Sequence, residues 1–244
     1  MKRYDAIEAV KNAISAEGLA DALFLKGSIA KGTDDDWSDV DFYAAVSPEN
    51  FDAFLARRIH YIEAYKPLIY WSNVNHVGPQ IVGVFEDGLH FDLYTVPTGA
   101  IPQTGEIKPL YDPAGILASY STAPLSVTSE EIIRAIHSFT FVLVEFEAAF
   151  HRGDTIWATR LSHALLGELS IVLRHLHDPQ NAQLGLKGIH KVIPKDMTEI
   201  LKNSMDVPAL IKLMSELIKQ LPTEVRKRIN MKFFEFMATS INLL

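Results

Sequence analysis

The chain has 244 residues, of which 48% are hydrophobic and 22% charged, a composition typical of globular proteins rather than disordered or fibrous ones. It contains no cysteine, which excludes disulfides, thiolate metal sites and a cysteine nucleophile. Its 23 Lys and Arg against 30 Asp and Glu give a net charge of −7, which disfavours a duplex nucleic-acid partner because phosphate contacts call for a basic surface.

The first half of the chain alternates helix and strand patterns. Apolar residues at helical spacing predict a helix over residues 4–17, which Gly18 would end. A second helix is predicted from Ser47 to about Ile62, with the serine as N-cap and Pro48 in the first turn. Strands are predicted over residues 22–26, 40–46, 68–72, 81–85 and 89–96.

The segments between these elements carry turn and loop residues. Residues 27–36 mix Gly, Ser, Thr and Asp and predict a loop or the tip of a helix, and Asp87-Gly88 predicts a hairpin turn. Residues 97–109 hold three prolines and two glycines, which indicates an exposed loop. Residues 110–112 are expected to return briefly to the sheet.

From Thr128 onward the pattern is helical. Thr128-x-x-Glu131 is a capping box that predicts a helix to about residue 150, and Asp154 is the expected N-cap of the next helix, to about residue 176. Further helices are predicted over residues 195–203, 206–220 and 223–242. The sequence therefore predicts an α+β fold, with a small mixed-sheet domain over residues 1–127 followed by an all-helical bundle over residues 128–244.

Charge is divided in the same way. Residues 1–127 hold 9 Lys and Arg against 17 Asp and Glu, a net −8, whereas residues 128–244 hold 14 against 13, a net +1. The acidic half could attract a metal ion or a cationic substrate. No apolar run approaches the ~18 residues of a spanning helix, and the chain begins with charged residues, so we expect a cytoplasmic protein with no membrane contact.

Three aspartates are the candidate catalytic and metal-binding residues. In a strand, residues i and i+2 point to the same face, so Asp39 and Asp41 would present two carboxylates about 6.6 Å apart at the backbone. Such a pair favours a hard divalent cation, Mg²⁺ or Mn²⁺. In the later strand His90, Asp92 and Tyr94 share one side, so Asp92 would join the pair if the two strands are neighbours.

The segment Gly27-Ser28 is the candidate phosphate-binding element. Glycine allows the backbone to approach a phosphate closely, and the serine hydroxyl and following amides could bind its oxygens, with Lys31 and Thr33 close enough to assist. The gap between Gly27 and Gly32 is that of a Walker motif, but the Lys-Ser/Thr that must follow is missing.

Together these residues resemble the polymerase-β-like nucleotidyltransferase superfamily, whose signature is Gly-Ser, a spacer of about ten, Asp-x-Asp on a strand and a later strand Asp. The stretch Gly27 to Gly32 also resembles the Gly-Ser-x-Ala-Arg/Lys-Gly form found in antibiotic nucleotidyltransferases and their bacterial relatives. The resemblance implies that Ser28 binds phosphate, that Asp39 and Asp41 are metal ligands, and that Asp92 is a metal ligand or the general base. Lys26 departs from the pattern, since the family usually has an apolar residue before the glycine.

The resemblance implies transfer of a nucleoside monophosphate from a nucleoside triphosphate, ATP first, to a hydroxyl of a small molecule, with Mg²⁺ or Mn²⁺ as cofactor and pyrophosphate as product. Antibiotics are among the acceptors it suggests, and no nucleic-acid template is expected. Glu145, Glu147 and Glu168 of the helical half are alternative bases. Two other functions stay open: transfer of AMP to a protein hydroxyl, and a nucleotide-binding sensor without turnover.

Two neighbouring features are less specific. Residues 34–36 are three consecutive aspartates, which we expect to be a solvated loop rather than a further metal site. Trp37 could shield the site or stack on a base, and a buried anchor is an equal alternative.

Overall fold

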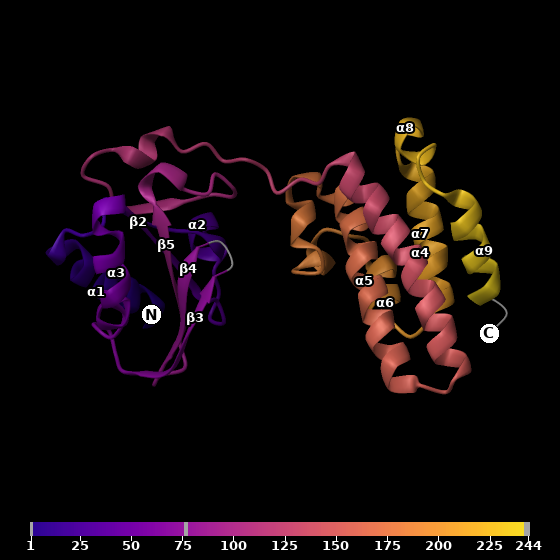
Figure 1. Cartoon of the computed structure of the whole chain (residues 1–244), viewed down its shortest axis with the longest axis horizontal. Helices are drawn as coiled ribbons and strands as arrows, with labels where there is room; N and C mark the ends of the chain where they lie inside the picture. The colour runs from indigo at the N-terminus through magenta and orange to yellow at the C-terminus, as the bar shows by residue number, and fades with distance from the viewer. Residues whose placement is uncertain (1, 76–77, 242–244) are drawn as a thin grey trace. The chain divides into compact units, whose positions relative to one another are not determined.

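The computed structural model describes residues 2–75 and 78–241 and divides the chain into two compact units, the first ending at Ala123 and the second beginning at Pro124 (Figure 1). The domain boundary predicted from the sequence lies four residues later, between residues 127 and 128. The expected α+β class is confirmed: one unit holds the sheet and the other is helical. Within the described residues, no helix is both long and apolar enough to cross a bilayer.

The first unit contains short helices around a six-stranded sheet. Its α-helices are α1 (Lys2–Glu17), α2 (Gly27–Lys31) and α3 (Phe51–Ile62), and its 3₁₀ turns are η1 (Pro48–Asn50), η2 (Thr98–Ala100) and η3 (Ile116–Ser119). Its strands are β1 (Ala22–Leu25), β2 (Val40–Val46), β3 (Leu68–Asn75), β4 (Pro79–Phe85), β5 (His90–Pro97) and β6 (Lys108–Tyr111).

The strand order is β3-β4-β5-β2-β1-β6. All neighbours are antiparallel except β2 and β5, which are parallel and in register, with Asp41 opposite Asp92. A parallel pair needs a long crossover, and here the connection runs through α3, β3 and β4. The sheet therefore places the strand of Asp92 directly beside the strand of Asp41.

The two faces of the sheet are covered differently. Helices α1 and α3 lie against one face (Figure 1), where Val10, Phe42 and Phe91 belong to a single buried cluster. On the other face a smaller cluster forms around Tyr43, with Leu117 packed on it from η3. Side chains alternate between the faces, so Asp41 and Asp92, next to Phe42 and Phe91, lie on this second face.

Several local predictions need correction at their ends. Ser47 is at the N-cap position, but its side chain caps nothing, and the 3₁₀ turn η1 precedes α3. Residues 97–109 are not all loop, because η2 lies there and β6 begins at Lys108 and pairs with β1. The predicted hairpin turn at Asp87-Gly88 is confirmed, with the Gly88 N–H donating to the Phe85 carbonyl at 2.8 Å.

The second unit packs its helices around one apolar core. They are α4 (Ser129–His151), α5 (Thr155–His177), α6 (Lys195–Lys202), α7 (Val207–Gln220), α8 (Thr223–Arg226) and α9 (Met231–Ile241), with 3₁₀ segments η4 (Pro179–Leu184) and η5 (Ile189–Lys191). Both predicted caps are confirmed: Thr128 and Glu131 form a capping box, and the Asp154 carboxylate accepts from the Trp157 N–H.

The single helix predicted over residues 223–242 is wrong, because the chain breaks between α8 and α9. Asn230 explains the break. Its side chain accepts from the Phe233 N–H at 3.1 Å and so caps α9, while its own N–H donates to His137 Nε2 at 3.0 Å. The second contact reaches across 93 residues and has no local sequence signal.

Candidate active site

The candidate site lies on the second face of the sheet, at the ends of β2 and β5. Asp41 and Asp92 are opposite one another in the parallel ladder, and Asp39 lies immediately before β2. The strand adjacency on which the sequence argument depended is thus present. Asp92 is the most enclosed, with its side chain only 11% exposed, whereas the Asp39 side chain is 40% exposed.

Gly27 lies directly against Asp41. It has a φ of +67°, and a Cβ atom there would be only 2.1 Å from Asp41 Oδ2, a distance that no side chain can adopt. The Lys26 N–H donates to the Asp41 carbonyl at 3.0 Å, which joins the end of β1 to β2. Glycine is therefore required twice, by the backbone conformation and by the carboxylate beside it.

Ser28 and Lys31 lie on α2, which forms where the sequence predicted a loop or helix tip. Ser28 is half-buried in the first turn, and its carbonyl accepts from the Thr33 N–H at 3.0 Å. Lys31 is exposed in the last turn. The phosphate-binding role of Gly27, Ser28 and Lys31 stays a prediction.

His90 is the residue that sequence reasoning did not single out. Its Nε2 lies 2.9 Å from Asp92 Oδ1, and its Nδ1 lies 3.8 Å from Asp39 Oδ2. The close approach of the Asp92 carboxylate raises the pKa of His90, with Asp39 and Asp41 adding to the effect and partial burial opposing it. The approach falls outside hydrogen-bond geometry, so Nε2 and Oδ1 are buried polar atoms without a hydrogen bond. The sequence signal that could have identified His90 is its position two residues before Asp92 in the same strand, which places both side chains on one face.

Lys26, the departure from the family pattern, is buried beneath the segment that follows β5. Its Nζ donates to the carbonyls of Pro102 and Thr104, each at 2.8 Å. It also lies over the rings of Tyr43 and Tyr120, 5.3 and 5.6 Å from their centroids. Burial lowers the pKa of Lys26 to about 8, although the charge of Asp41 opposes the change.

The aspartate run before β2 is only partly a solvated loop, which corrects the expectation for Asp34. Its Oδ2 accepts from Arg3 Nε and from the Tyr4 hydroxyl, both at 2.8 Å, which ties this loop to α1. Asp36 conforms to the expectation, with a side chain 92% exposed. Trp37 is 94% exposed, so the buried-anchor alternative is wrong.

The carboxylates of Asp39, Asp41 and Asp92 are the type of ligand that a hard divalent cation prefers, although they do not form a preorganised metal site. Across residues 2–75 and 78–241, no three Asp, Glu or His side chains converge on one point as a metal-binding group. The donor set nevertheless fits Mg²⁺ or Mn²⁺, because it is made of carboxylate oxygens and because Asp92 Oδ1 is buried without a hydrogen bond. Asp39, Asp41 and Asp92 are the residues that would hold such an ion.

The alternative bases lie in the second unit and differ in their surroundings. Glu168 lines a cavity of about 480 Å³ together with Arg134 and Ser138, and burial raises the pKa of its carboxyl group. Glu147 accepts from the Ser240 hydroxyl, and Glu145 is exposed on α4.

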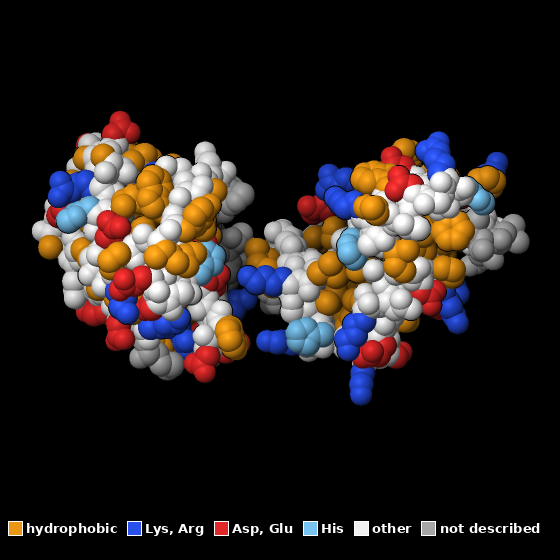
Figure 2. All heavy atoms as spheres, turned by 90° about the horizontal axis from the view of Figure 1, so that it is seen from below, with side chains coloured by type: hydrophobic (Ala, Val, Ile, Leu, Met, Phe, Trp, Pro, Cys, Tyr) orange, Lys and Arg blue, Asp and Glu red, His pale blue; other side chains and the backbone are white. Residues whose placement is uncertain are grey.

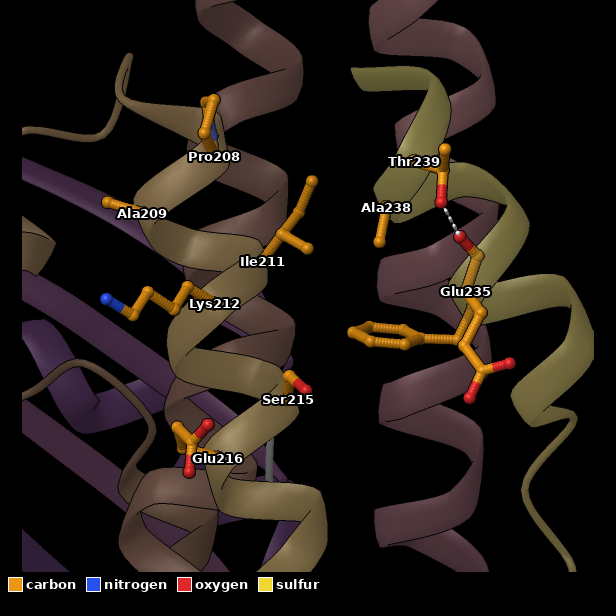
Figure 3. Close-up of a pocket in the computed structure, with 10 residues that line it drawn as sticks. Pro208, Ala209, Ile211, Lys212, Ser215, Glu216, Glu235, Ala238 and Thr239 are labelled. Carbon is orange, nitrogen blue, oxygen red and sulfur yellow. Dashed lines mark hydrogen bonds between the residues drawn. The ribbon is translucent and has the colours of Figure 1, made fainter. Parts of the chain in front are cut away.

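A second hollow of this unit, of about 530 Å³, lies between α7 and α9, where Ile211 and Ser215 face Ala238 (Figure 3). It contains none of the residues predicted for the site. On the face drawn in Figure 2, Lys and Arg side chains of the second unit occur in several separate places among acidic and apolar ones. The absence of a nucleic-acid template stays a prediction.

No family model matches the chain, and no curated protein matches it. Among solved structures, it is similar to an aminoglycoside 6-adenyltransferase from Bacillus subtilis, at 12% sequence identity and a TM-score of 0.31, over 96% of this chain and 97% of that one. A TM-score of this size is too low to show a common fold.

Proposed function

We propose that the protein is a metal-dependent nucleotidyltransferase that moves a nucleoside monophosphate from a nucleoside triphosphate, ATP first, to a hydroxyl of a small molecule. The observation that carries the proposal is the in-register pairing of Asp41 with Asp92, with Gly27 against the Asp41 carboxylate. The sequence pattern of Gly27-Ser28, Asp39-x-Asp41 and Asp92 supports the same reaction.

Asp39, Asp41 and Asp92 would hold Mg²⁺ or Mn²⁺ in this scheme. A bound ion lowers the pKa of the acceptor hydroxyl and neutralises charge on the triphosphate. Gly27 and Ser28 would bind phosphate oxygens through the backbone and the serine hydroxyl. The acceptor oxygen would form a bond to the α-phosphorus, the bond to pyrophosphate would break, and the Asp92 carboxylate would take the hydroxyl proton.

A thermal-shift titration tests the nucleotide site without knowledge of the acceptor. The full chain is heated with ATP, GTP, CTP or UTP, each with and without Mg²⁺, and compared with Asp39→Asn. Asp36→Asn is the matched control, because it removes the same charge three residues earlier in the chain, where the side chain is 92% exposed. We expect one triphosphate with Mg²⁺ to raise the melting temperature of the wild type and of the control, but much less that of Asp39→Asn.

If no triphosphate shifts the wild type at millimolar concentration, the proposed site is wrong. If a triphosphate does bind, analysis of the products distinguishes the three candidate functions. Release of pyrophosphate in the presence of hydroxylated small molecules supports the proposal, whereas AMP on lysate proteins in mass spectrometry points to protein modification. Binding without release of pyrophosphate in either assay points to a nucleotide sensor.

A further inference from the structure

His90 lies between two of the carboxylates to which a metal ion is assigned above. It is the first residue of β5 and lies on the same face as Asp92. One ring nitrogen approaches each acid: Nε2 is 2.9 Å from Asp92 Oδ1, and Nδ1 is 3.8 Å from Asp39 Oδ2. The imidazole therefore occupies the space between Asp39 and Asp92.

A divalent cation that approaches Asp92 Oδ1 from the side of Asp39 would meet the imidazole, because the His90 ring lies between the two carboxylates. That oxygen is buried, and His90 Nε2 is the polar atom that the structure places against it. Two carboxylates on neighbouring strands repel one another, and either a cation or an imidazole N–H between them reduces the cost. The two occupants are thus alternatives.

Of the two side chains in contact, His90 is the one that can leave. Its side chain is 43% exposed, whereas that of Asp92 is 11% exposed and belongs to a residue whose strand, β5, is paired on both sides, with β2 and with β4. Rotation of the histidine side chain toward solvent would free Asp92 Oδ1 without moving the strand.

We propose that His90 competes with the divalent cation for Asp39 and Asp92, and that it turns away from both carboxylates when the ion binds. This rests on the proposed function, because it takes the metal ligands from there. His90 is then a positioning residue. It orients Asp92 before the ion arrives, and it lowers the affinity for the ion.

Binding of Mn²⁺ alone to the full-length protein at one fixed pH tests this, followed by the loss of the free Mn²⁺ signal in electron paramagnetic resonance. We expect His90→Ala to bind Mn²⁺ about three- to tenfold more tightly than the wild type, the effect of removing one partly exposed charged contact. His151→Ala, at an exposed histidine in the second unit, is the control and should bind as the wild type does. Equal or weaker binding by His90→Ala overturns the proposal, and weaker binding would make His90 a metal ligand.

Nuclear magnetic resonance of the histidine side chains in the unaltered protein is a second readout that needs no substitution at the site. Addition of Mg²⁺ should move the His90 imidazole signals toward those of a solvated histidine such as His151, and unchanged signals would contradict displacement. If neither the wild type nor His90→Ala binds Mn²⁺, the metal site of the proposed function has failed. If the wild type binds and His90→Ala gains nothing, only the role of His90 has failed.

Discussion

Replacement of Gly27 by alanine separates the two reasons for a glycine at this position, and Gly32 is a matched control. Both glycines belong to the α2 turn and have nearly equal positive φ values, +67° and +65°. A Cβ on Gly32 would meet nothing within 4 Å, whereas one on Gly27 would meet Asp41 Oδ2 at 2.1 Å. Any difference between the two alanine variants therefore reports the contact with Asp41.

The expected costs follow from these two contributions. A left-handed backbone costs a residue with a side chain about 1–2 kcal/mol, so Gly32→Ala should lower the free energy of unfolding by about that amount. Gly27→Ala must in addition displace the half-buried Asp41 carboxylate by roughly 1 Å, which costs about 1–3 kcal/mol more. We expect a total of about 2–5 kcal/mol for Gly27→Ala.

Urea unfolding followed by circular dichroism measures both variants, and calorimetry measures their binding of ATP with Mg²⁺. Gly27→Ala should lose nucleotide binding, and Gly32→Ala should retain most of it. In an Asp41→Ala background the carboxylate is gone, so Gly27→Ala should cost no more than Gly32→Ala. Equal stability of the two glycine variants in the wild-type background would refute a clash between residue 27 and Asp41, and so would an extra cost of Gly27→Ala that persists without the Asp41 carboxylate.

Three further predictions concern side chains outside the carboxylate cluster. Thr128→Ala removes the capping box of α4 and should lower the free energy of unfolding by about 1 kcal/mol, measured by urea denaturation; an unchanged value would contradict the cap. Burial raises the pKa of Glu168, so its ionised form destabilises the folded protein above that pKa. Glu168→Gln should therefore be more stable than the wild type at pH 7, and the difference should vanish toward pH 3, where both side chains are neutral in the folded and unfolded chains. The pKa of Lys26 is lowered to about 8, so the unfolded chain binds more protons between about pH 8 and 10. Wild-type stability relative to Lys26→Met should rise over that range by about 2–3 kcal/mol, and parallel pH profiles of the two proteins would rule this out.

Features with local causes could be predicted from the sequence. The capping box at Thr128 needs only a residue three positions later, and the turn at Asp87-Gly88 needs only its own two residues. The strand of Asp39-x-Asp41 and that of Asp92 follow from alternation. Their adjacency in the sheet was a condition of the argument, since alternation says nothing about which strands become neighbours.

Features that depend on distant residues had no such signal. The partners of Lys26 are carbonyls 76 and 78 residues away, so the sequence could show only an unusual lysine beside Gly27. Asp34 looks like any loop aspartate until α1 brings Arg3 beside it. For His90, the alternation of side chains along the strand indicated that it lies on the same face as Asp92. It did not indicate how close the two side chains come to one another.

The parallel register of β2 and β5 has a consequence for insertions and deletions in the chain. The crossover through α3, β3 and β4 can change length at its turns while Asp41 and Asp92 stay opposite one another. Loss of one residue inside β5 ahead of Asp92 is different, because it would turn that carboxylate to the face that α1 and α3 cover. We therefore expect length variation in this protein to be confined to the connections, with the spacing inside the two strands left intact.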